Sequence, residues 1–228
     1  MALSPPELLP GQGPGREAPE APDPPEGEAR RVPPTPLAYA LIGLCVLAFG
    51  ASARFPALHD AGVLYGPAVA RGEWWRLLTT ALLHGGPLHL VFNLSAVWTL
   101  GRWLERVLGT GRFALLTLVG TLGSSAAVLA ANFTTPTLGI SGVILAWAGF
   151  ALPISDPSLR QQLRIWLLQV AALSLLPGIS WAGHLGGFLA GLPVGLALRG
   201  GARRFDLVLP VVALAAAAVT AGALLIHR

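Results

Sequence analysis

The sequence predicts an all-α protein that crosses a membrane several times, on the evidence of its composition and its apolar runs. Of the 228 residues, 54% are hydrophobic and only 11% are charged, and the mean hydropathy is +0.64. Soluble domains carry roughly 25% charged residues, so this chain is too apolar to cover a water-facing surface. Seven apolar runs approach the roughly 20 residues that span a bilayer core. They cover residues 36–53, 84–103, 112–131, 139–154, 163–177, 181–198 and 207–226.

The chain begins with a segment of different composition. Residues 1–35 are rich in Pro, Gly and Glu and nearly free of aromatic residues. Such a segment buries too little apolar surface to offset the entropy of ordering it. It also lacks the basic-then-apolar pattern of a secretory signal peptide. We therefore expect a disordered cytoplasmic tail, then a helical membrane core over residues 36–199 and a separate last helix over residues 205–228.

A mixed segment, residues 54–75, separates the first apolar run from the second. It holds His59, Asp60, two prolines and several glycines among apolar residues. This mixture is typical of amphipathic structure that lies at a membrane–water interface. We expect an interfacial loop at this point of the chain.

The arginines predict the orientation in the membrane. The net charge of +4 involves fifteen arginines and no lysine. We interpret them as topology signals rather than as a nucleic-acid surface, because cytoplasmic flanks of spans are enriched in basic residues. A cytoplasmic N-terminus places eleven arginines on that side: Arg16, Arg30, Arg31, Arg102, Arg106, Arg112, Arg160, Arg164, Arg199, Arg203 and Arg204. The other side receives four: Arg54, Arg71, Arg76 and Arg228. Seven spans then put the C-terminus outside a plasma or inner membrane.

Span parity groups the polar side chains on one side. The second, fourth and sixth runs all enter from the outer face, and each carries polar residues near its start. These residues are His84, His89, Asn93, Ser141 and His184. The acids at the inner ends of the spans are Glu105, Asp156 and Asp206. Because polar groups are costly inside a membrane, a cluster drawn from three helices predicts a functional site.

Ser141 and His184 are a candidate nucleophile and general base. A serine hydroxyl needs a base to take its proton near neutral pH, and histidine is suited to this task. No acid falls on the outer half of any span, so we expect a dyad rather than a triad. Ser141 heads a predicted helix, where free N–H groups favour negative charge. His89 and Asn93 lie four residues apart on one helical face, and both can donate a hydrogen bond.

The fourth run is short for a span. Its 16 residues cover about 24 Å as a helix, against a hydrocarbon core of roughly 30 Å. Ser141 should therefore lie below the outer surface, with residues 132–138 dipping inward as non-helical backbone. Such backbone is tolerated only where it is buried in protein or lines a cavity. We expect a recessed site that opens outward.

Glycines recur every four residues along the sixth run, at Gly183, Gly187, Gly191 and Gly195. A ridge of small residues lets another helix approach closely. Gly142 offers a small partner surface on the fourth run. We expect the packing of these two helices to bring His184 within reach of Ser141.

Metal-dependent and cofactor-dependent chemistry finds little support in the sequence. His84 and His89 are five residues apart, about 140° around a helix, and so do not form a metal pair on one face. No H-E-x-x-H motif is present, and residues 139–143 lack the last glycine of a hydrolase elbow. The single cysteine, Cys45, can form no internal disulfide. We expect no cofactor and no metal.

Five motifs, in this order, resemble those of the rhomboid intramembrane serine proteases. They are Glu73-Trp74-Trp75-Arg76, His84-x4-His89-x3-Asn93, Gly101-x3-Glu105, Gly139-x-Ser141-Gly142 and His184-x2-Gly187-x3-Gly191. The resemblance covers about residues 36–199. It implies a six-helix transmembrane bundle, to which the last run adds the C-terminal helix of a six-plus-one (6+1) form.

The resemblance implies cleavage of transmembrane protein substrates at or near the outer end of their helix. Those substrates and the lipid bilayer would be the partners, with no nucleic acid. Ser141 would be the nucleophile, His184 the general base, and His89, Asn93 and the Ser141 backbone N–H the oxyanion contacts. The other motif residues would be structural: Arg76, His84, Glu105, Gly139, Gly142, Gly187 and Gly191.

Leu145 departs from the family pattern, because active members commonly carry an aromatic residue at this position, packed on the histidine. It is the sequence feature that favours the alternative, a non-catalytic rhomboid-like protein that binds transmembrane helices. A small-solute transporter would show inverted repeats and a polar midplane path, and neither is evident. The physiological substrate and the oligomeric state stay open.

Overall fold

The computed structural model describes residues 33–227, so most of the predicted tail over residues 1–35 lies outside the described residues. The described part is helical, with one isolated β-bridge. This confirms the predicted all-α class. The elements, including the 3-10 turn η1 and the π-helical turn η2, are α1 (Pro36–Arg54), α2 (Pro56–Gly62), α3 (Gly66–Ala70), α4 (Arg76–Thr79), η1 (Thr80–Leu82), α5 (Pro87–Ala96), η2 (Val97–Gly101), α6 (Arg102–Leu108), α7 (Thr110–Ala131), α8 (Ser141–Ile154), α9 (Pro157–Leu173), α10 (Trp181–Arg199) and α11 (Ala202–Ile226).

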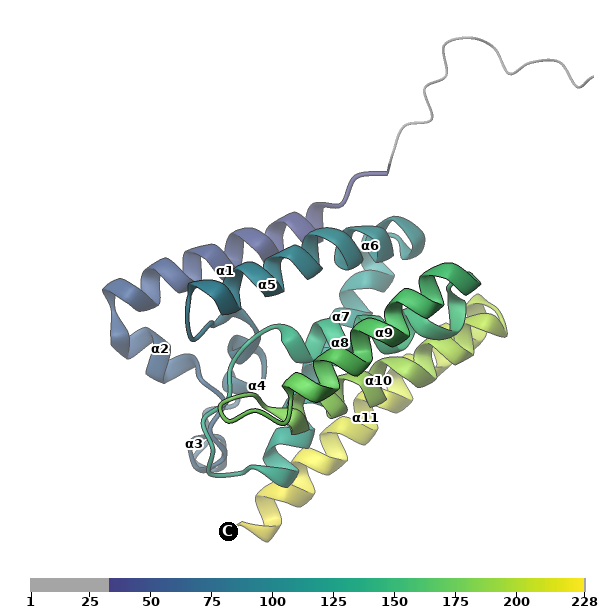
Figure 1. Cartoon of the computed structure of the whole chain (residues 1–228). Coiled ribbons are helices and arrows are strands. Elements are labelled where there is room, and N and C mark those ends of the chain that lie inside the picture. The colour runs from purple at the N-terminus through teal and green to yellow at the C-terminus, as the bar shows by residue number, and fades with distance from the viewer. Residues whose placement is uncertain (1–32, 228) are drawn as a thin grey trace, which may run out of the picture. The chain divides into compact units, whose positions relative to one another are not determined.

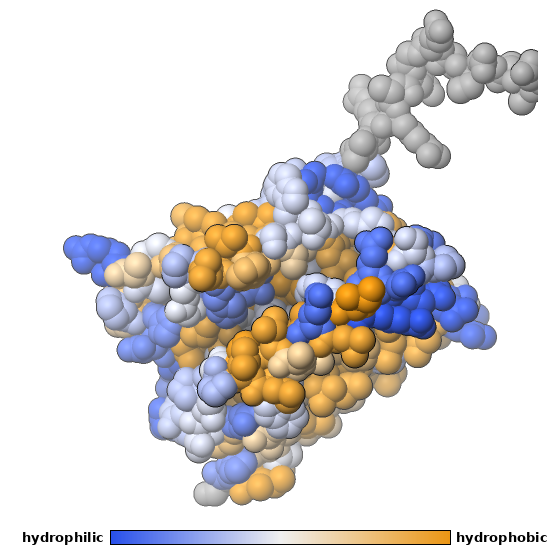
Figure 2. Space-filling model, in the orientation of Figure 1, coloured by the Kyte–Doolittle hydropathy of each residue, from blue (hydrophilic) through white to orange (hydrophobic). Residues whose placement is uncertain are grey.

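Helices α7 to α11 run back and forth between two ends of the bundle (Figure 1). The starts of α5, α8 and α10 therefore share one end with the short helices α2, α3 and α4. Apolar surface covers the middle of the helices, and hydrophilic residues gather towards the ends (Figure 2). An apolar band of this kind is what a bilayer core requires of the surface that faces it.

Four helices, α1, α7, α10 and α11, are long and apolar enough to cross a membrane. A fifth span is reached if the bent pair Arg76–Leu82 and Pro87–Leu108 counts as one. α8 is apolar but has only 14 residues, as its short apolar run predicts. α9 is polar in its first half, where Arg160, Arg164 and two glutamines lie. The seven spans therefore remain a prediction.

α9 begins six residues before the predicted run 163–177 and ends four residues before that run ends. Asp156 caps the helix, because its carboxylate accepts hydrogen bonds of 2.9 and 3.0 Å from two backbone N–H groups of the first turn. Pro157 occupies the first helical position, where its missing N–H costs nothing. A prediction from apolarity alone misses this polar first turn.

The second apolar run does not begin as a helix. η1 ends at Leu82 and α5 begins at Pro87, with a bend of 95° between the two helical segments. Two glycines followed by a proline make this break, since they favour a turn over a continuing helix. His84 lies in the turn, so the placement of His84 and His89 140° apart on one helix is wrong. Their rings instead meet edge to face, with centroids 5.1 Å apart.

Arg76 holds the first loop together. Its buried guanidinium donates hydrogen bonds of 2.6 Å to the backbone carbonyls of Asp60 and Val63. It also donates at 2.6 and 2.9 Å to the Glu73 carboxylate. A buried charge is tolerated when it is paired and hydrogen-bonded in this way. Residues 56–79 thus form a folded layer rather than a loose connection.

Glu105 has a comparable role at the opposite end of the bundle. Its carboxylate is fully buried and accepts hydrogen bonds from the backbone N–H groups of Leu37 (3.0 Å) and Ala38 (2.8 Å) and from the Thr110 hydroxyl (2.8 Å). The first N–H groups of a helix have no partner within the helix. Glu105 on α6 therefore caps α1 and fixes α1 against the bundle.

Candidate active site

Backbone hydrogen bonds hold the non-helical residues 132–140 in front of α8. Leu64 and Thr137 exchange two backbone bonds of 2.9 and 3.0 Å. The Thr80 hydroxyl donates to the Thr137 carbonyl at 2.7 Å, and the Gly139 N–H donates to the Thr80 carbonyl at 2.9 Å. Irregular backbone is tolerated at membrane depth when its polar groups are satisfied by protein. Residues 132–140 are thus held in one conformation, which fixes the position of Ser141 at the start of α8.

Glycine is required at position 139, two residues before Ser141. Its φ of +119° lies in a region that L side chains rarely adopt. A Cβ atom there would lie 2.9 Å from His89 Cε1, 3.0 Å from His89 Nε2 and 3.7 Å from Ser141 Oγ. The missing side chain lets the His89 ring and the Ser141 hydroxyl both lie close to the backbone of Gly139. A residue with a side chain at position 139 would push the His89 ring away.

α8 and α10 approach each other through glycine. A Cβ atom on Gly187 would overlap the backbone of Gly142, and one on Gly191 would overlap the backbone carbonyl of Ala146. The third helix of this contact is α7, where a Cβ atom on Gly120 would overlap the Ala146 side chain. None of these glycines leaves room for a side chain. The relative positions of α7, α8 and α10 are therefore set by backbone contact.

This contact brings His184 to Ser141. His184 Nε2 lies 2.8 Å from Ser141 Oγ, although 43 residues separate the two in sequence. The Ser180 hydroxyl caps α10 by accepting a hydrogen bond of 3.2 Å from the Gly183 N–H, and His184 therefore lies in the first turn. A serine hydroxyl within hydrogen-bond distance of an imidazole nitrogen can pass its proton to that nitrogen.

Sequence reasoning missed Ser174, which follows α9 and contacts the other ring nitrogen of His184. Ser174 Oγ lies 2.6 Å from His184 Nδ1. The Ser174 hydroxyl also donates a hydrogen bond of 2.7 Å to the Val170 carbonyl, and the residue is buried. A lone serine inside an apolar run, here residues 163–177, has no distinctive spacing, so no pattern in the sequence could have singled it out.

His89 can donate a hydrogen bond towards Ser141. Its Nδ1 lies 3.4 Å from the Gly85 backbone N–H, which can only donate. Nδ1 is therefore the acceptor, and in the neutral ring the proton is carried on Nε2. A Cβ atom on Gly139 would lie 3.0 Å from Nε2 and 3.7 Å from Ser141 Oγ. The donor of His89 and the Ser141 hydroxyl thus both lie beside Gly139.

Two buried nitrogens next to His89, Asn93 Nδ2 and His84 Nε2, have no hydrogen-bond partner within the part of the chain that the structure describes. Asn93 lies one turn after His89 on α5 and is almost fully buried. The other ring nitrogen of His84 lies 3.3 Å from the Leu82 carbonyl. An unpaired buried donor costs free energy. Among the described residues, Asn93 thus offers a buried donor without an acceptor, one helical turn after His89.

The start of α8 adds backbone donors. The first backbone bond of this helix runs from the Ile144 N–H to the Ile140 carbonyl. The N–H groups of Ser141 and Gly142 therefore have no acceptor within the helix. The helix dipole also favours negative charge at this end. An anion formed next to Ser141 would be stabilised by both effects.

The candidate residues do not all meet at one site. Arg76 supports the first loop, and Glu105 caps α1 at the other end of the bundle. Leu145 lines an apolar pocket of about 570 Å³ with Ser174 and His184, between α8, α9 and α10. Within residues 33–227, no three His, Cys, Asp or Glu side chains are grouped as a metal site would need.

Comparisons with known proteins point to one family. The family model of the Rhomboid domain matches residues 71–201. The chain is 33% identical over 175 residues to the rhomboid protease GluP of Bacillus subtilis (strain 168), and 33% identical over 178 residues to the rhomboid protease GlpG of Enterobacter sp. (strain 638). It is 31% identical over 154 residues to RHOMBOID-like protein 5 of Arabidopsis thaliana.

These alignments cover 70%, 72% and 63% of this chain, in the same order, and 34%, 62% and 50% of the three relatives. The chain thus spans less than two thirds of the length of each of them. The Rhomboid domain match takes in more than half of the chain and runs from the first loop through the end of α10, which includes Ser141 and His184. This integral membrane protein therefore belongs to the rhomboid family.

Proposed function

We propose that this protein is an intramembrane serine endopeptidase. It hydrolyses peptide bonds in or near the transmembrane segments of other membrane proteins, through a dyad of Ser141 and His184. The observation that carries the proposal is the distance of 2.8 Å between Ser141 Oγ and His184 Nε2, at the point where α8 and α10 both begin. Membership of a family in which two relatives are named rhomboid proteases supports it.

The proposed reaction is acyl transfer to serine. His184 Nε2 takes the hydroxyl proton as Ser141 Oγ attacks the carbonyl carbon of the scissile peptide bond. The protonated His184 then gives that proton to the leaving amine, and the C–N bond breaks to leave an ester on Ser141. Water, deprotonated by His184, hydrolyses the ester and restores the hydroxyl.

Three donors would stabilise the negative oxygen of the intermediate. They are the backbone N–H of Ser141, the unpartnered Nδ2 of Asn93 and the Nε2 proton of His89. His89 Nε2 lies beside Gly139, which has no side chain, and Asn93 lies one helical turn after His89 on α5. A preorganised donor of this kind is typically worth about 10²- to 10³-fold in rate. Asn93 fits this role because no group in the described residues accepts from its Nδ2.

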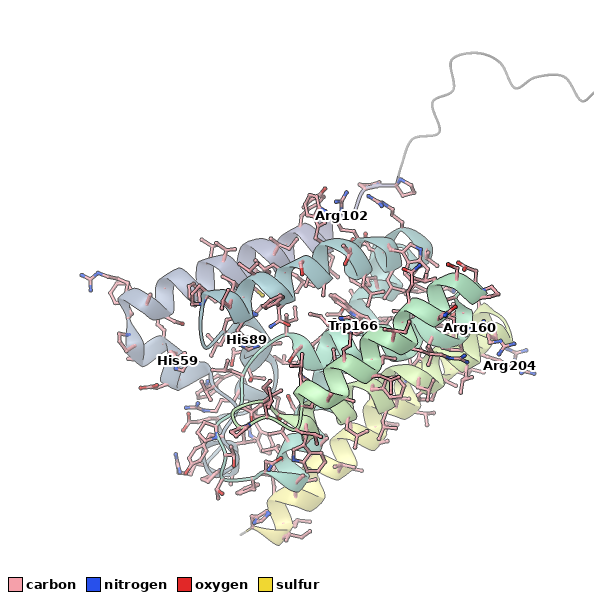
Figure 3. The ribbon with its side chains drawn as sticks, in the orientation of Figure 1. His59, His89, Arg102, Arg160, Trp166 and Arg204 are labelled. Carbon is pink, nitrogen blue, oxygen red and sulfur yellow. The ribbon has the colours of Figure 1, made fainter. Side chains whose placement is uncertain are left out.

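The substrate must present an extended peptide bond. A bond within a helix is shielded by its own hydrogen bonds, so residues that weaken the substrate helix should favour cleavage. We extend the proposal to orientation, with the N-terminus cytoplasmic and the site facing outward. Arg102, Arg160 and Arg204 lie toward the end of the bundle opposite His59 and His89 (Figure 3), as the enrichment of arginine on cytoplasmic flanks requires. Reporter fusions after Arg199 and after the last helix would test this orientation.

The decisive experiment is labelling by a fluorophosphonate probe in detergent, comparing the parent protein with Ser141→Ala and His184→Ala. The probe reports an activated serine and needs no knowledge of the substrate. We expect labelling of the parent alone, followed by loss of cleavage of a transmembrane reporter in both variants. Ser180→Ala, which removes a helix-capping hydroxyl near the dyad, is the matched control and should still be labelled.

The second candidate function is binding of transmembrane helices without catalysis. The observation in its favour is Leu145, which leaves a pocket of about 570 Å³ beside His184. A folded parent that is not labelled and does not cleave the reporter, yet still captures a transmembrane helix, would establish this function in place of the protease.

A further inference from the structure

His184 has a hydroxyl partner on each of its two ring nitrogens. Ser141 Oγ lies 2.8 Å from Nε2, and Ser174 Oγ lies 2.6 Å from Nδ1. The two serines come from different parts of the fold, the start of α8 and the end of α9. A neutral imidazole has one donor nitrogen and one acceptor nitrogen. The direction of the Ser174 contact therefore decides what Nε2 can do for Ser141.

The proton of the Ser174 hydroxyl is already committed. The hydroxyl lies 2.7 Å from the Val170 backbone carbonyl, and a carbonyl can only accept. With its single proton donated to Val170, the Ser174 oxygen accepts from His184 Nδ1–H. Nε2 is then the unprotonated nitrogen and accepts from Ser141. The hydrogen bonds thus run in one direction, from Ser141 to His184, from His184 to Ser174 and from Ser174 to the Val170 carbonyl.

We propose that Ser174 is a positioning residue for the hydrolysis reaction, which fixes the tautomer and the ring orientation of His184. This inference rests on the proposed function of the Ser141–His184 dyad. When His184 takes the proton of Ser141, both ring nitrogens become donors, and Ser174 still accepts from Nδ1. The contact therefore supports the neutral base before the attack and the imidazolium that follows it.

The surroundings explain why a neutral acceptor suits this place. Ser174 and His184 line an apolar pocket with Leu145, Val170 and Ala171. An ionised carboxylate buried there would need further partners to offset its loss of hydration. A hydroxyl that is itself held by a backbone carbonyl avoids that cost. Ser174 thus orients His184 in a chain that carries Leu145 where an aromatic ring would otherwise pack.

The position of Ser174 also links the base to α9. Leu163 is the one buried residue within Pro157–Leu173, and the pocket of about 570 Å³ lies between α9 and the helices that carry the dyad. The Ser174–His184 hydrogen bond joins the end of α9 to the dyad across the rim of that pocket. His184 is therefore correctly oriented only while this end of α9 is in place.

Two buried serines provide a matched test. Ser155 at the end of α8 donates to the carbonyl four residues earlier at 2.8 Å, as Ser174 does at 2.7 Å at the end of α9. Within the described residues, Ser155 makes no hydrogen bond to Ser141 or His184. We expect Ser174→Ala to lower kcat for a transmembrane reporter, and the rate of fluorophosphonate labelling, about 10- to 100-fold with KM changed less than threefold. Ser155→Ala should leave both within threefold of the parent.

A second pair of variants separates the effect of the Ser174 hydroxyl from the effect of side-chain size and shape. Ser174→Thr keeps a hydroxyl acceptor, whereas Ser174→Val has nearly the same shape without it, and the adjoining pocket gives room for the added methyl group. We expect Thr to restore the labelling rate to within about threefold of the parent and Val to behave like Ala. Equal rates for Thr and Val would overturn the inference.

The tautomer of His184 gives a readout that does not need activity. In ¹⁵N spectra of the histidine-labelled protein, assigned through His184→Ala, we expect a protonated Nδ1 in the parent and in Ser174→Thr. Ser174→Ala and Ser174→Val should show a mixture or the opposite tautomer. If the parent is folded but unlabelled by the probe, the dyad proposal fails, while these spectra still decide the role of Ser174. An Nε2-protonated ring in the parent would refute the inference.

Discussion

His184 is held on two sides by contacts of opposite kinds. On one side, α8 and α10 meet backbone to backbone, because Gly187 and Gly191 leave no room for a side chain against α8. On the other side, α9 reaches His184 through a single side-chain hydrogen bond beside an apolar pocket. Leu168 and Leu175, on and just after α9, are 72% and 84% exposed.

The difference shows on which side of His184 a substitution can change the proposed activity without unfolding the protein. Backbone contact between α8 and α10 fixes the separation of Ser141 and His184, so a change there acts on the fold and the site together. A hydrogen bond at the end of α9 can be lost while the bundle stays folded. Function should therefore be lost before stability on the α9 side, and together with stability on the α8–α10 side.

The largest effect is expected for Gly191→Ala. The added Cβ atom would overlap the Ala146 carbonyl, which cannot move without shifting α8. We expect a loss of about 3 kcal/mol or more in unfolding free energy, together with loss of probe labelling. The control is Gly222→Ala on α11, where a Cβ atom meets none of the described residues within 4 Å, and it should be neutral or slightly stabilising. Thermal unfolding in detergent would measure both, and an equally stable Gly191→Ala would break the comparison.

Asn93→Ala, unlike Gly191→Ala, should lower activity without lowering stability. Its Nδ2 is buried and has no hydrogen-bond partner within residues 33–227, so its removal relieves a desolvation cost while it deletes a proposed oxyanion donor. We expect about a 10²- to 10³-fold fall in cleavage rate with an unchanged or raised unfolding temperature. Ser95→Ala, an exposed position of the same helix, is the control. A drop in stability without a drop in rate would contradict the proposed role.

Arg160→Ala tests the attachment of α9 at the end away from the dyad. The guanidinium donates to the carbonyls of Leu152 (3.2 Å) and Ser155 (2.6 Å) at the end of α8. Losing these bonds should lower the unfolding free energy by about 1–2 kcal/mol. Because Ser174 lies at the opposite end of α9, the labelling rate should stay within threefold of the parent. A larger fall would mean that the whole of α9 moves as one body with His184.

The smallest effect is expected for Leu145→Phe, which adds a ring towards the pocket of about 570 Å³. The adjoining pocket gives room for a larger side chain, so we expect a change in unfolding free energy of less than about 1 kcal/mol and labelling within threefold. In combination with Ser174→Ala, the ring should recover part of the lost labelling by packing on His184. No recovery in the double variant would show that packing cannot substitute for the hydrogen bond.

Much of the fold could be predicted, because the length of an apolar run and the turn residues at its ends determine where a helix begins and ends. The runs 36–53, 112–131 and 181–198 match α1, α7 and α10 closely, since each is bounded by breaks in apolarity. The start of α9 was placed six residues late, because Asp156 and Pro157 begin the helix before its apolar part. The placement of His84 on a helix failed because the glycine pair before Pro87 was counted as part of the span.

The sequence alone determined the all-α membrane class, the family resemblance and the candidate pair of Ser141 and His184, because apolar runs and spaced motifs are properties of the chain itself. The tertiary structure decided how the histidine is held. The role proposed for Ser174 depends on His184 of another helix, whose Nδ1 lies 2.6 Å from the Ser174 hydroxyl. The role proposed for Asn93 depends on the absence of any acceptor for its Nδ2 among the described residues. A serine hydroxyl or an asparagine amide has no distinctive signature in the sequence, because tertiary packing alone determines which hydrogen-bond partners lie within its reach.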